Sequence, residues 1–220
     1  MEETVALERS SPSLTALLRW SGMALVAGGV AMIVASLLHP SLETDTTIPQ
    51  TEVKLVAAHV FYTLAYLLVL LGLPGLYGHE FVRMGRLGLA GFVVAFSGTA
   101  LLAVSGNFGF IAPVLASESP GTIDAISRYG PVVVFNGVTA IAFMVGWVIF
   151  GIAMARTDTL PAASGALVAV GAPTHLIGFG LAQLASPPLW PIAIAGSVAL
   201  GAGLAWPGYQ LWRGSEEGIR

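Results

Sequence analysis

The chain has 220 residues, of which 55% are hydrophobic and only 10% are charged, and its formal net charge is −3 at pH 7. A soluble domain carries about 25% charged residues, so this sequence is that of an integral membrane protein. The scattered basic residues form no patch for a nucleic-acid backbone. The absence of cysteine excludes disulfides, thiolate metal sites and thiol nucleophiles, and no Walker, GxSxG or HExxH motif points to an enzyme.

Six stretches of the sequence are long and apolar enough to cross a bilayer, which takes about 20 residues in a helix. They cover about 20–38, 55–77, 87–115, 131–155, 162–185 and 190–212. Open strands cannot span lipid, because their backbone groups would stay unpaired. The sequence therefore predicts an all-α, polytopic bundle of six transmembrane helices over residues 20–212, after an N-terminal segment 1–19 and before a tail 213–220.

The basic residues predict the orientation of this bundle. Seven of the nine fall on one side of the predicted membrane, namely Arg9, Arg19, Arg83, Arg86, Arg156, Arg213 and Arg220, which leaves Lys54 and Arg128 on the other. The positive-inside rule then places both termini in the cytoplasm. His39-Pro40 closes the first span and LLGLPGLYGHE closes the second. In this general style the chain resembles six-helix proteins of bacteria, which implies a bacterial plasma membrane and brings no known activity.

Glycines recur with matched spacing in the odd-numbered spans. Gly22 and Gly29 in the first span correspond to Gly91 and Gly98 in the third. This pattern is typical of three helical hairpins related by an internal repeat. It also arises from close helix packing in lipid, and a glycine-rich face left free would suit a membrane-protein partner or a second copy of the chain.

The depth of the polar residues carries most of the functional information. No Asp, Glu, Lys or Arg falls inside a predicted span, which argues against a carboxylate proton relay within the membrane. The remaining polar side chains gather in the outer half: His59, Tyr62, Tyr66, Asn107, Asn136, His175 and Gln183. They predict an outward-facing polar pocket above an apolar inner half, although hydrogen bonding within the bundle would explain the histidines and amides as well.

Several functions fit this pocket. The first hypothesis is binding or transport of a small molecule or lipid, since Gly/Pro-interrupted helices near polar groups are typical of such sites. The alternative is haem b held by His59 and His175, although His175 lies about 9 Å deeper at the helical rise. A metal site with His39, Glu43 and Asp45 at the outer surface, and an accessory subunit of a membrane complex, are further alternatives. At the inner surface we expect His79 and Glu80 to be solvated.

Overall fold

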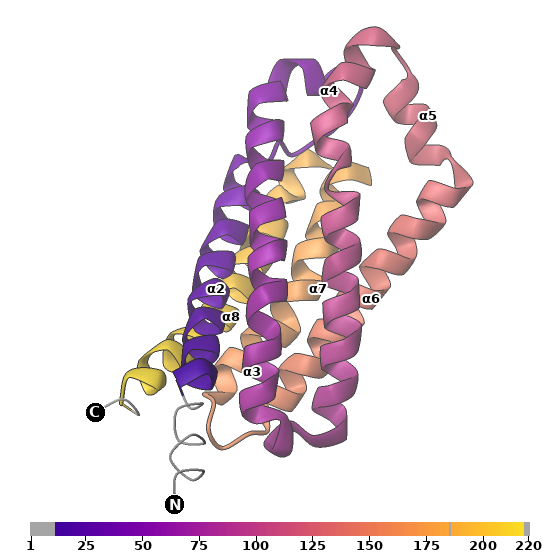
Figure 1. The fold of residues 1–220 in the computed structure, drawn as a ribbon. Helices are drawn as coiled ribbons and strands as arrows, with labels where there is room; N and C mark the ends of the chain where they lie inside the picture. Colours follow the sequence, from indigo (N-terminus) through magenta and orange to yellow (C-terminus); the bar gives the residue numbers. More distant parts are fainter. Residues whose placement is uncertain (1–11, 185, 218–220) are drawn as a thin grey trace, which may run out of the picture.

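The computed structural model describes residues 12–184 and 186–217, and every element in them is helical (Figure 1). The helices are α2 (Pro12–Leu38), α3 (Ile48–Ser105), α4 (Phe108–Glu118), α5 (Thr122–Arg128), α6 (Gly130–Ala155), α7 (Ala162–Leu184), the short 3-10 helix η2 (Pro187–Leu189) and α8 (Trp190–Glu217). This confirms the predicted all-α bundle. Parts of the predicted terminal segments, including Arg9 and Arg220, lie outside the described residues.

Helix α3 supplies two membrane crossings. If straight, its 58 residues would extend about 87 Å, far beyond the bilayer core of about 30 Å. The chain instead reverses at Gly85, whose φ of 55° and ψ of −150° suit a residue without a Cβ. The two arms lie antiparallel, because Tyr77 stacks on Phe92 with ring centroids 4.6 Å apart. Among the described residues, five continuous helical stretches are long and apolar enough to cross a membrane, and the second, with its reversal, is long enough to cross twice.

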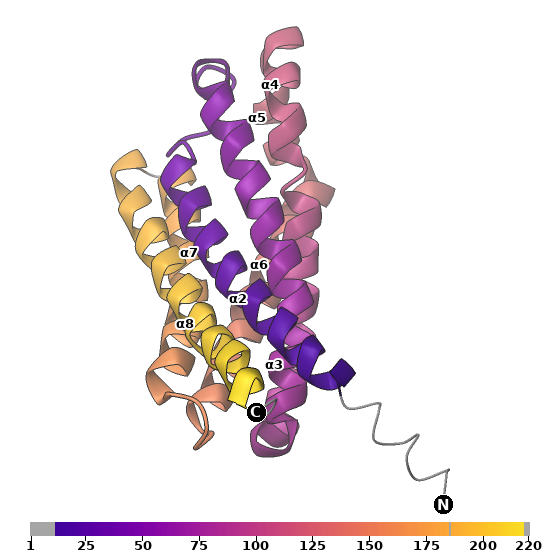
Figure 2. The ribbon, with the colours of Figure 1, turned by 60° about the vertical axis from the view of Figure 1, so that its left-hand side comes forward.

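The helices form a closed ring in sequence order (Figures 1 and 2). Helix α2 packs on α3, α3 on α6, α6 on α7 and α7 on α8, which returns to α2. The matched glycines lie at these contacts, but against different partners. Gly22 and Gly29 face the backbone of α8, whereas Gly91 and Gly98 face that of α6. Close packing within the chain therefore explains their spacing, and these glycine faces are already covered.

The two ends of the bundle differ in chemistry. We call the end with the α2–α3 connection (residues 39–47) and the start of α8 the histidine end. The opposite end, with Gly85 and the α6–α7 connection (residues 156–161), is the arginine end. The space between them is filled by apolar side chains that are fully buried, including Leu25, Leu73, Leu200 and Leu204.

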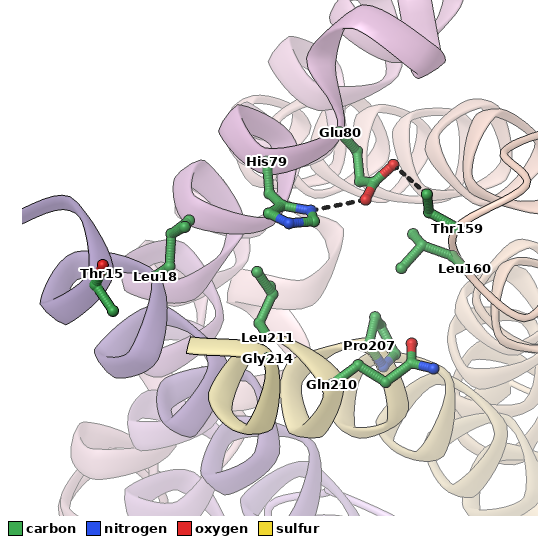
Figure 3. Close-up of a pocket in the computed structure, with 10 residues that line it drawn as sticks. All are labelled: Thr15, Leu18, His79, Glu80, Thr159, Leu160, Pro207, Gln210, Leu211 and Gly214. Carbon is green, nitrogen blue, oxygen red and sulfur yellow. Dashed lines mark hydrogen bonds and ion pairs between the residues drawn. The ribbon is translucent and has the colours of Figure 1, made fainter. Parts of the chain in front are cut away.

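A cavity of about 370 Å³ lies at the arginine end, between α2, α3, α8 and the α6–α7 connection (Figure 3). Glu80 lines it and has no exposed surface. The expectation that His79 and Glu80 are both solvated is therefore wrong for Glu80, because the α6–α7 connection covers its carboxylate. The imidazole of His79 remains about half exposed.

The outer part of the third predicted span is broken at Gly106 and Asn107. Helix α3 ends at Ser105 and α4 begins at Phe108. Beyond this break α6 leans away from α4, and the two are joined through α5 (Figure 1). This divergence leaves the first turns of α6 exposed, and Asn136 lies in this exposed part.

Candidate functional site

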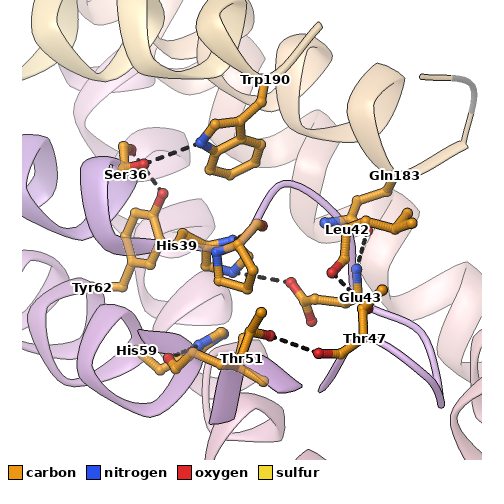
Figure 4. A network of polar contacts seen from close by, with 12 residues as sticks. Ser36, His39, Leu42, Glu43, Thr47, Thr51, His59, Tyr62, Gln183 and Trp190 are labelled. Atoms are coloured by element: carbon orange, nitrogen blue, oxygen red, sulfur yellow. Dashed lines mark hydrogen bonds and ion pairs between the residues drawn. The ribbon is translucent and has the colours of Figure 1, made fainter. Parts of the chain in front are cut away.

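The histidine end is centred on a buried pair formed by His39 and Glu43. Helix α2 ends at Leu38, and the chain turns inward at His39, which is only 4% exposed. The Nδ1–H of His39 donates to the carbonyl oxygen of Pro40 at 2.7 Å. Its Nε2 lies 3.0 Å from Oε1 of Glu43, and the two side chains lie side by side within the α2–α3 connection (Figure 4).

The pair joins an imidazole to a carboxylate. Nδ1 of His39 donates to a carbonyl oxygen, and its Nε2 faces the carboxylate of Glu43. Burial by itself would raise the pKa of Glu43, but contact with His39 and the nearby positive charge outweigh that effect. The pKa of Glu43 is therefore lowered, and its carboxylate is ionised at neutral pH.

Aromatic rings enclose the His39 imidazole. Trp190 of α8 stacks on it, with ring centroids 5.1 Å apart and an interplanar angle of 23°. Phe179 of α7 approaches at 5.4 Å, and Tyr62 of α3 approaches edge-on at 5.8 Å. The ring of His59 lies 5.2 Å away. These rings bury the imidazole of His39 and fix its orientation.

The α2–α3 connection is tied to other elements by its polar residues. The backbone N–H of Glu43 donates to Oε1 of Gln183 on α7 at 2.9 Å. The carboxylate of Asp45 accepts the backbone N–H groups of Ile123 and Asp124, both at 3.3 Å. Asp45 therefore binds the start of α5 and points away from His39. These bonds hold the connection over the end of the bundle.

A second layer of hydrogen bonds lies deeper and joins four helices. The hydroxyl of Tyr62 on α3 is 2.8 Å from Oγ of Ser36 on α2. Ser36 in turn contacts Oγ of Ser197 on α8, which lies 2.7 Å from Nδ1 of His175 on α7. The indole N–H of Trp190 donates to the carbonyl oxygen of Ser36 at 3.2 Å. These hydrogen bonds pair the polar groups of the deeper layer and hold the four helices together beneath the His39–Glu43 pair.

Three polar atoms at the contact between His39, Glu43 and Gln183 lack a hydrogen bond. Nε2 of His39 and Oε1 of Glu43 touch each other without an aligned hydrogen bond, and Nε2 of Gln183 has no partner. All three are buried. A buried polar group left without its hydrogen bond costs about 1–3 kcal/mol. Because all three atoms lie at one place, a molecule bound there would gain the most from new hydrogen bonds.

The structure brings together most, but not all, of the residues predicted to line a pocket. His59, Tyr62, His175 and Gln183 meet at the histidine end, and Tyr66 joins them by stacking on Tyr62 with centroids 5.9 Å apart. His59 lies half-buried, with its Nδ1–H donating to the carbonyl oxygen of Leu55 at 2.9 Å.

The two amides are the exceptions. Asn107 is exposed and its amide nitrogen donates to the carbonyl oxygens of Ala103 and Val104, at 3.4 and 3.2 Å. Asn136 is exposed on the part of α6 that leans away from α4. Placing them in the pocket was wrong, because α4 and α6 do not converge at this end.

This geometry argues against the haem and the metal hypotheses. The Tyr62 ring is 6.3 Å from that of His59 and 5.9 Å from that of His175, so a haem held by both histidines would have to displace Tyr62 and break the chain to Ser36. The proposed metal ligands His39, Glu43 and Asp45 do not converge, because Asp45 is directed to α5. Within the described residues no group of three or more His, Cys, Asp or Glu side chains could hold a metal ion.

Sequence reasoning missed the serines and the aromatic walls. Ser36 lies in the last turn of α2, three residues before His39, and Trp190 lies seven residues before Ser197 on one face of α8. That spacing was the available signal. No protein-family model, curated protein or solved structure matches this chain. The functional conclusion rests on the contacts of the histidine end.

Proposed function

We propose that this integral membrane protein binds a small hydrogen-bonding molecule at the histidine end. The observation that carries the proposal is the buried contact between His39 and the Glu43 carboxylate, next to an amide nitrogen of Gln183 with no partner. A fold gains little from burying charges whose hydrogen bonds are incomplete. A ligand that completes those hydrogen bonds would explain why the polar groups are buried. Functional residues also often lie on the connections between helices.

The available atoms define the chemistry of the ligand. Oε1 of Glu43 accepts hydrogen bonds, whereas Nε2 of Gln183 and Nε2 of His39 donate them. Trp190 and Phe179 supply aromatic walls. The site therefore suits a compact molecule that carries both donors and acceptors on a flat or apolar frame. Entry requires displacement of the α2–α3 connection, since the side chains of His39 and Trp190 are buried in the closed form.

The apolar half below the site supports binding over transport. The buried leucines between the two ends separate the histidine end from the cavity at the arginine end. Transport would require a second arrangement of the ring in which this region opens. Binding needs only movement of one connection.

We propose further that the histidine end faces the outside of a bacterial plasma membrane and that both termini are cytoplasmic, since most basic residues lie at the arginine end. The natural chain has no cysteine, so single cysteines report the orientation cleanly. In intact cells a membrane-impermeant maleimide is expected to label Glu52→Cys and to leave Arg156→Cys unlabelled until the cells are lysed. Both positions are exposed. The opposite labelling pattern would reverse the proposed orientation.

Binding is tested by purifying the wild-type protein and Glu43→Gln in mild detergent and measuring the released small molecules by mass spectrometry. Glutamine keeps the shape of the side chain but removes its charge. Loss of a charge-assisted hydrogen bond costs about 1.5–3 kcal/mol, so we expect the compound retained by the wild type to fall about tenfold or more in Glu43→Gln.

The matched control is Glu52→Gln, which removes the same charge from an exposed position near the same end. It should retain the compound at the wild-type level. Equal retention by Glu43→Gln, measured on protein with an unchanged helical spectrum, would count against the site.

A further inference from the structure

The short helix α5 depends on the α2–α3 connection for the capping of its first turn. The backbone N–H groups at the start of a helix have no partner within the helix, and Gly121, which precedes α5, has no side chain to accept from them. The N–H groups of Ile123 and Asp124 instead donate to the two carboxylate oxygens of Asp45, both at 3.3 Å. Asp45, which lies 78 residues before Ile123, therefore acts as the N-terminal cap of α5.

Few other contacts hold α5 against the bundle. The helix has seven residues, and helices shorter than about 12 residues are marginal in water without tertiary packing. Of these seven residues, all of which the structure describes, only Ile123 is buried. Its side chain belongs to a small apolar cluster with Ile48, Leu55, Ala112 and Ala116 of α3 and α4. One buried side chain and the cap from Asp45 therefore attach α5 to its neighbours.

The turn that carries Asp45 is braced by its own hydrogen bonds. The backbone N–H of Thr44 donates to Oγ1 of Thr47 at 2.9 Å, and the Thr47 hydroxyl donates to the carbonyl oxygen of Leu42 at 2.9 Å. Side chains that bond to the backbone in this way stabilise a turn. Glu43 and Asp45 both lie within it. We expect the turn to move as one body, so that displacement of Glu43 also displaces Asp45.

The same turn closes the histidine end. The backbone N–H of Glu43 donates to Oε1 of Gln183 at 2.9 Å, and Oε1 of Glu43 lies 3.0 Å from Nε2 of His39. His39 is buried while the connection is in this position. A movement that exposes His39 must break the contact with Gln183, and the braced turn then draws Asp45 away from α5.

We propose that α5 is a latch on the histidine end: it is helical only while the α2–α3 connection is closed, and its two bonds to Asp45 keep that connection closed. This inference rests on the proposed function, because the latch controls access to the same site. When the connection opens, α5 loses its cap and unwinds, and when α5 refolds it draws the connection back. Coupling of this kind acts equally in both directions.

Hydrogen exchange measures the folding of α5 without any ligand. The full-length protein is exchanged in nanodiscs of phosphatidylcholine, and peptides that cover residues 122–128 are followed by mass spectrometry. Asp45→Ala removes the cap and should raise the exchange rate of these amides about fivefold or more. Gln183→Ala removes the anchor of the connection on α7 and should also raise it, because the coupling is reciprocal.

The matched control for this experiment is Glu52→Ala, which removes an exposed carboxylate near the same end and should exchange as the wild type does. Unchanged exchange of residues 122–128 in Asp45→Ala would show that the cap does not hold α5. Faster exchange in Asp45→Ala together with wild-type exchange in Gln183→Ala would make Asp45 a local cap without a link to the site. Either result would overturn the latch.

Thiol labelling measures access to the site separately. The natural chain has no cysteine, and Gln183→Cys places a thiol where the connection covers the wild-type side chain. Addition of Asp45→Ala should raise the rate of maleimide labelling about fivefold or more, whereas addition of Glu52→Ala should leave the rate unchanged. Equal rates in the two double variants would contradict the latch. Neither readout needs a ligand, so failure of the latch is distinguishable from failure of the wild type to retain a compound.

Discussion

Replacing His39 by alanine is expected to destabilise the protein by about 3 kcal/mol or more at pH 7. The substitution removes the imidazole partner of Glu43 while leaving that carboxylate largely buried. It also removes the ring on which Trp190 stacks and which Phe179 contacts. Unfolding by SDS titration in mixed micelles, followed by circular dichroism, measures the loss.

A double-mutant cycle with Glu43→Gln separates the free energy of the His39–Glu43 contact from that of the lost packing. In the Glu43→Gln background, His39→Ala should cost distinctly less, because no buried charge is left unpaired. The pH dependence has a definite sign. Since the pKa of Glu43 is lowered by folding, the contribution of the pair is complete above the ordinary carboxyl pKa and is lost as the pH falls through the lowered value. Equal costs of His39→Ala in both backgrounds would show that the pair is not coupled.

Replacing Gly178 by leucine is expected to prevent stable packing of α7 against α8. A Cβ at Gly178 would lie within 2.9 Å of the backbone of Ile192 and Ala193, and backbone atoms cannot move aside as a flexible side chain can. Overpacking typically costs about 1–3 kcal/mol, and occasionally more. Because α7 carries His175 and α8 carries Ser197, the deeper layer of the site should be lost as well. Size-exclusion chromatography and SDS titration report the loss of the folded form.

Gly180 provides a matched control two residues along the same helix. A Cβ there would meet no atom within 4 Å, so Gly180→Leu should change the unfolding free energy by no more than about 0.5 kcal/mol. Similar stability of the two leucine variants would contradict the close approach of α7 and α8.

Hydropathy predicted the architecture because the bilayer imposes a length on every crossing. The reversal at Gly85 falls between two predicted spans, and the break after Ser105 follows from Gly106 and the nearby Pro113. These are local properties of the chain. Each is decided by a few neighbouring residues and needs no knowledge of which helices meet.

The candidate site was less predictable because its contacts join distant parts of the chain. Glu43 bonds to Gln183, 140 residues away, and Ser36 contacts Ser197, 161 residues away. The sequence placed His39 and Glu43 at the outer surface, whereas the fold buries His39 against Trp190 and brings Glu43 into contact with it. It assigned Asn136 to the interior, whereas α6 leans away from α4 there. Which helices converge at an end cannot be derived from the depth of a residue alone.

The central claim is that the His39–Glu43 pair binds a small molecule. The most direct measurement is the molar ratio of released compound to protein for the wild type, Glu43→Gln and Glu52→Gln, purified under the same conditions. We predict a stoichiometric compound in the wild type and in Glu52→Gln, and about one tenth of that amount or less in Glu43→Gln. The same compound at the same ratio in all three proteins would contradict a binding site at the histidine end.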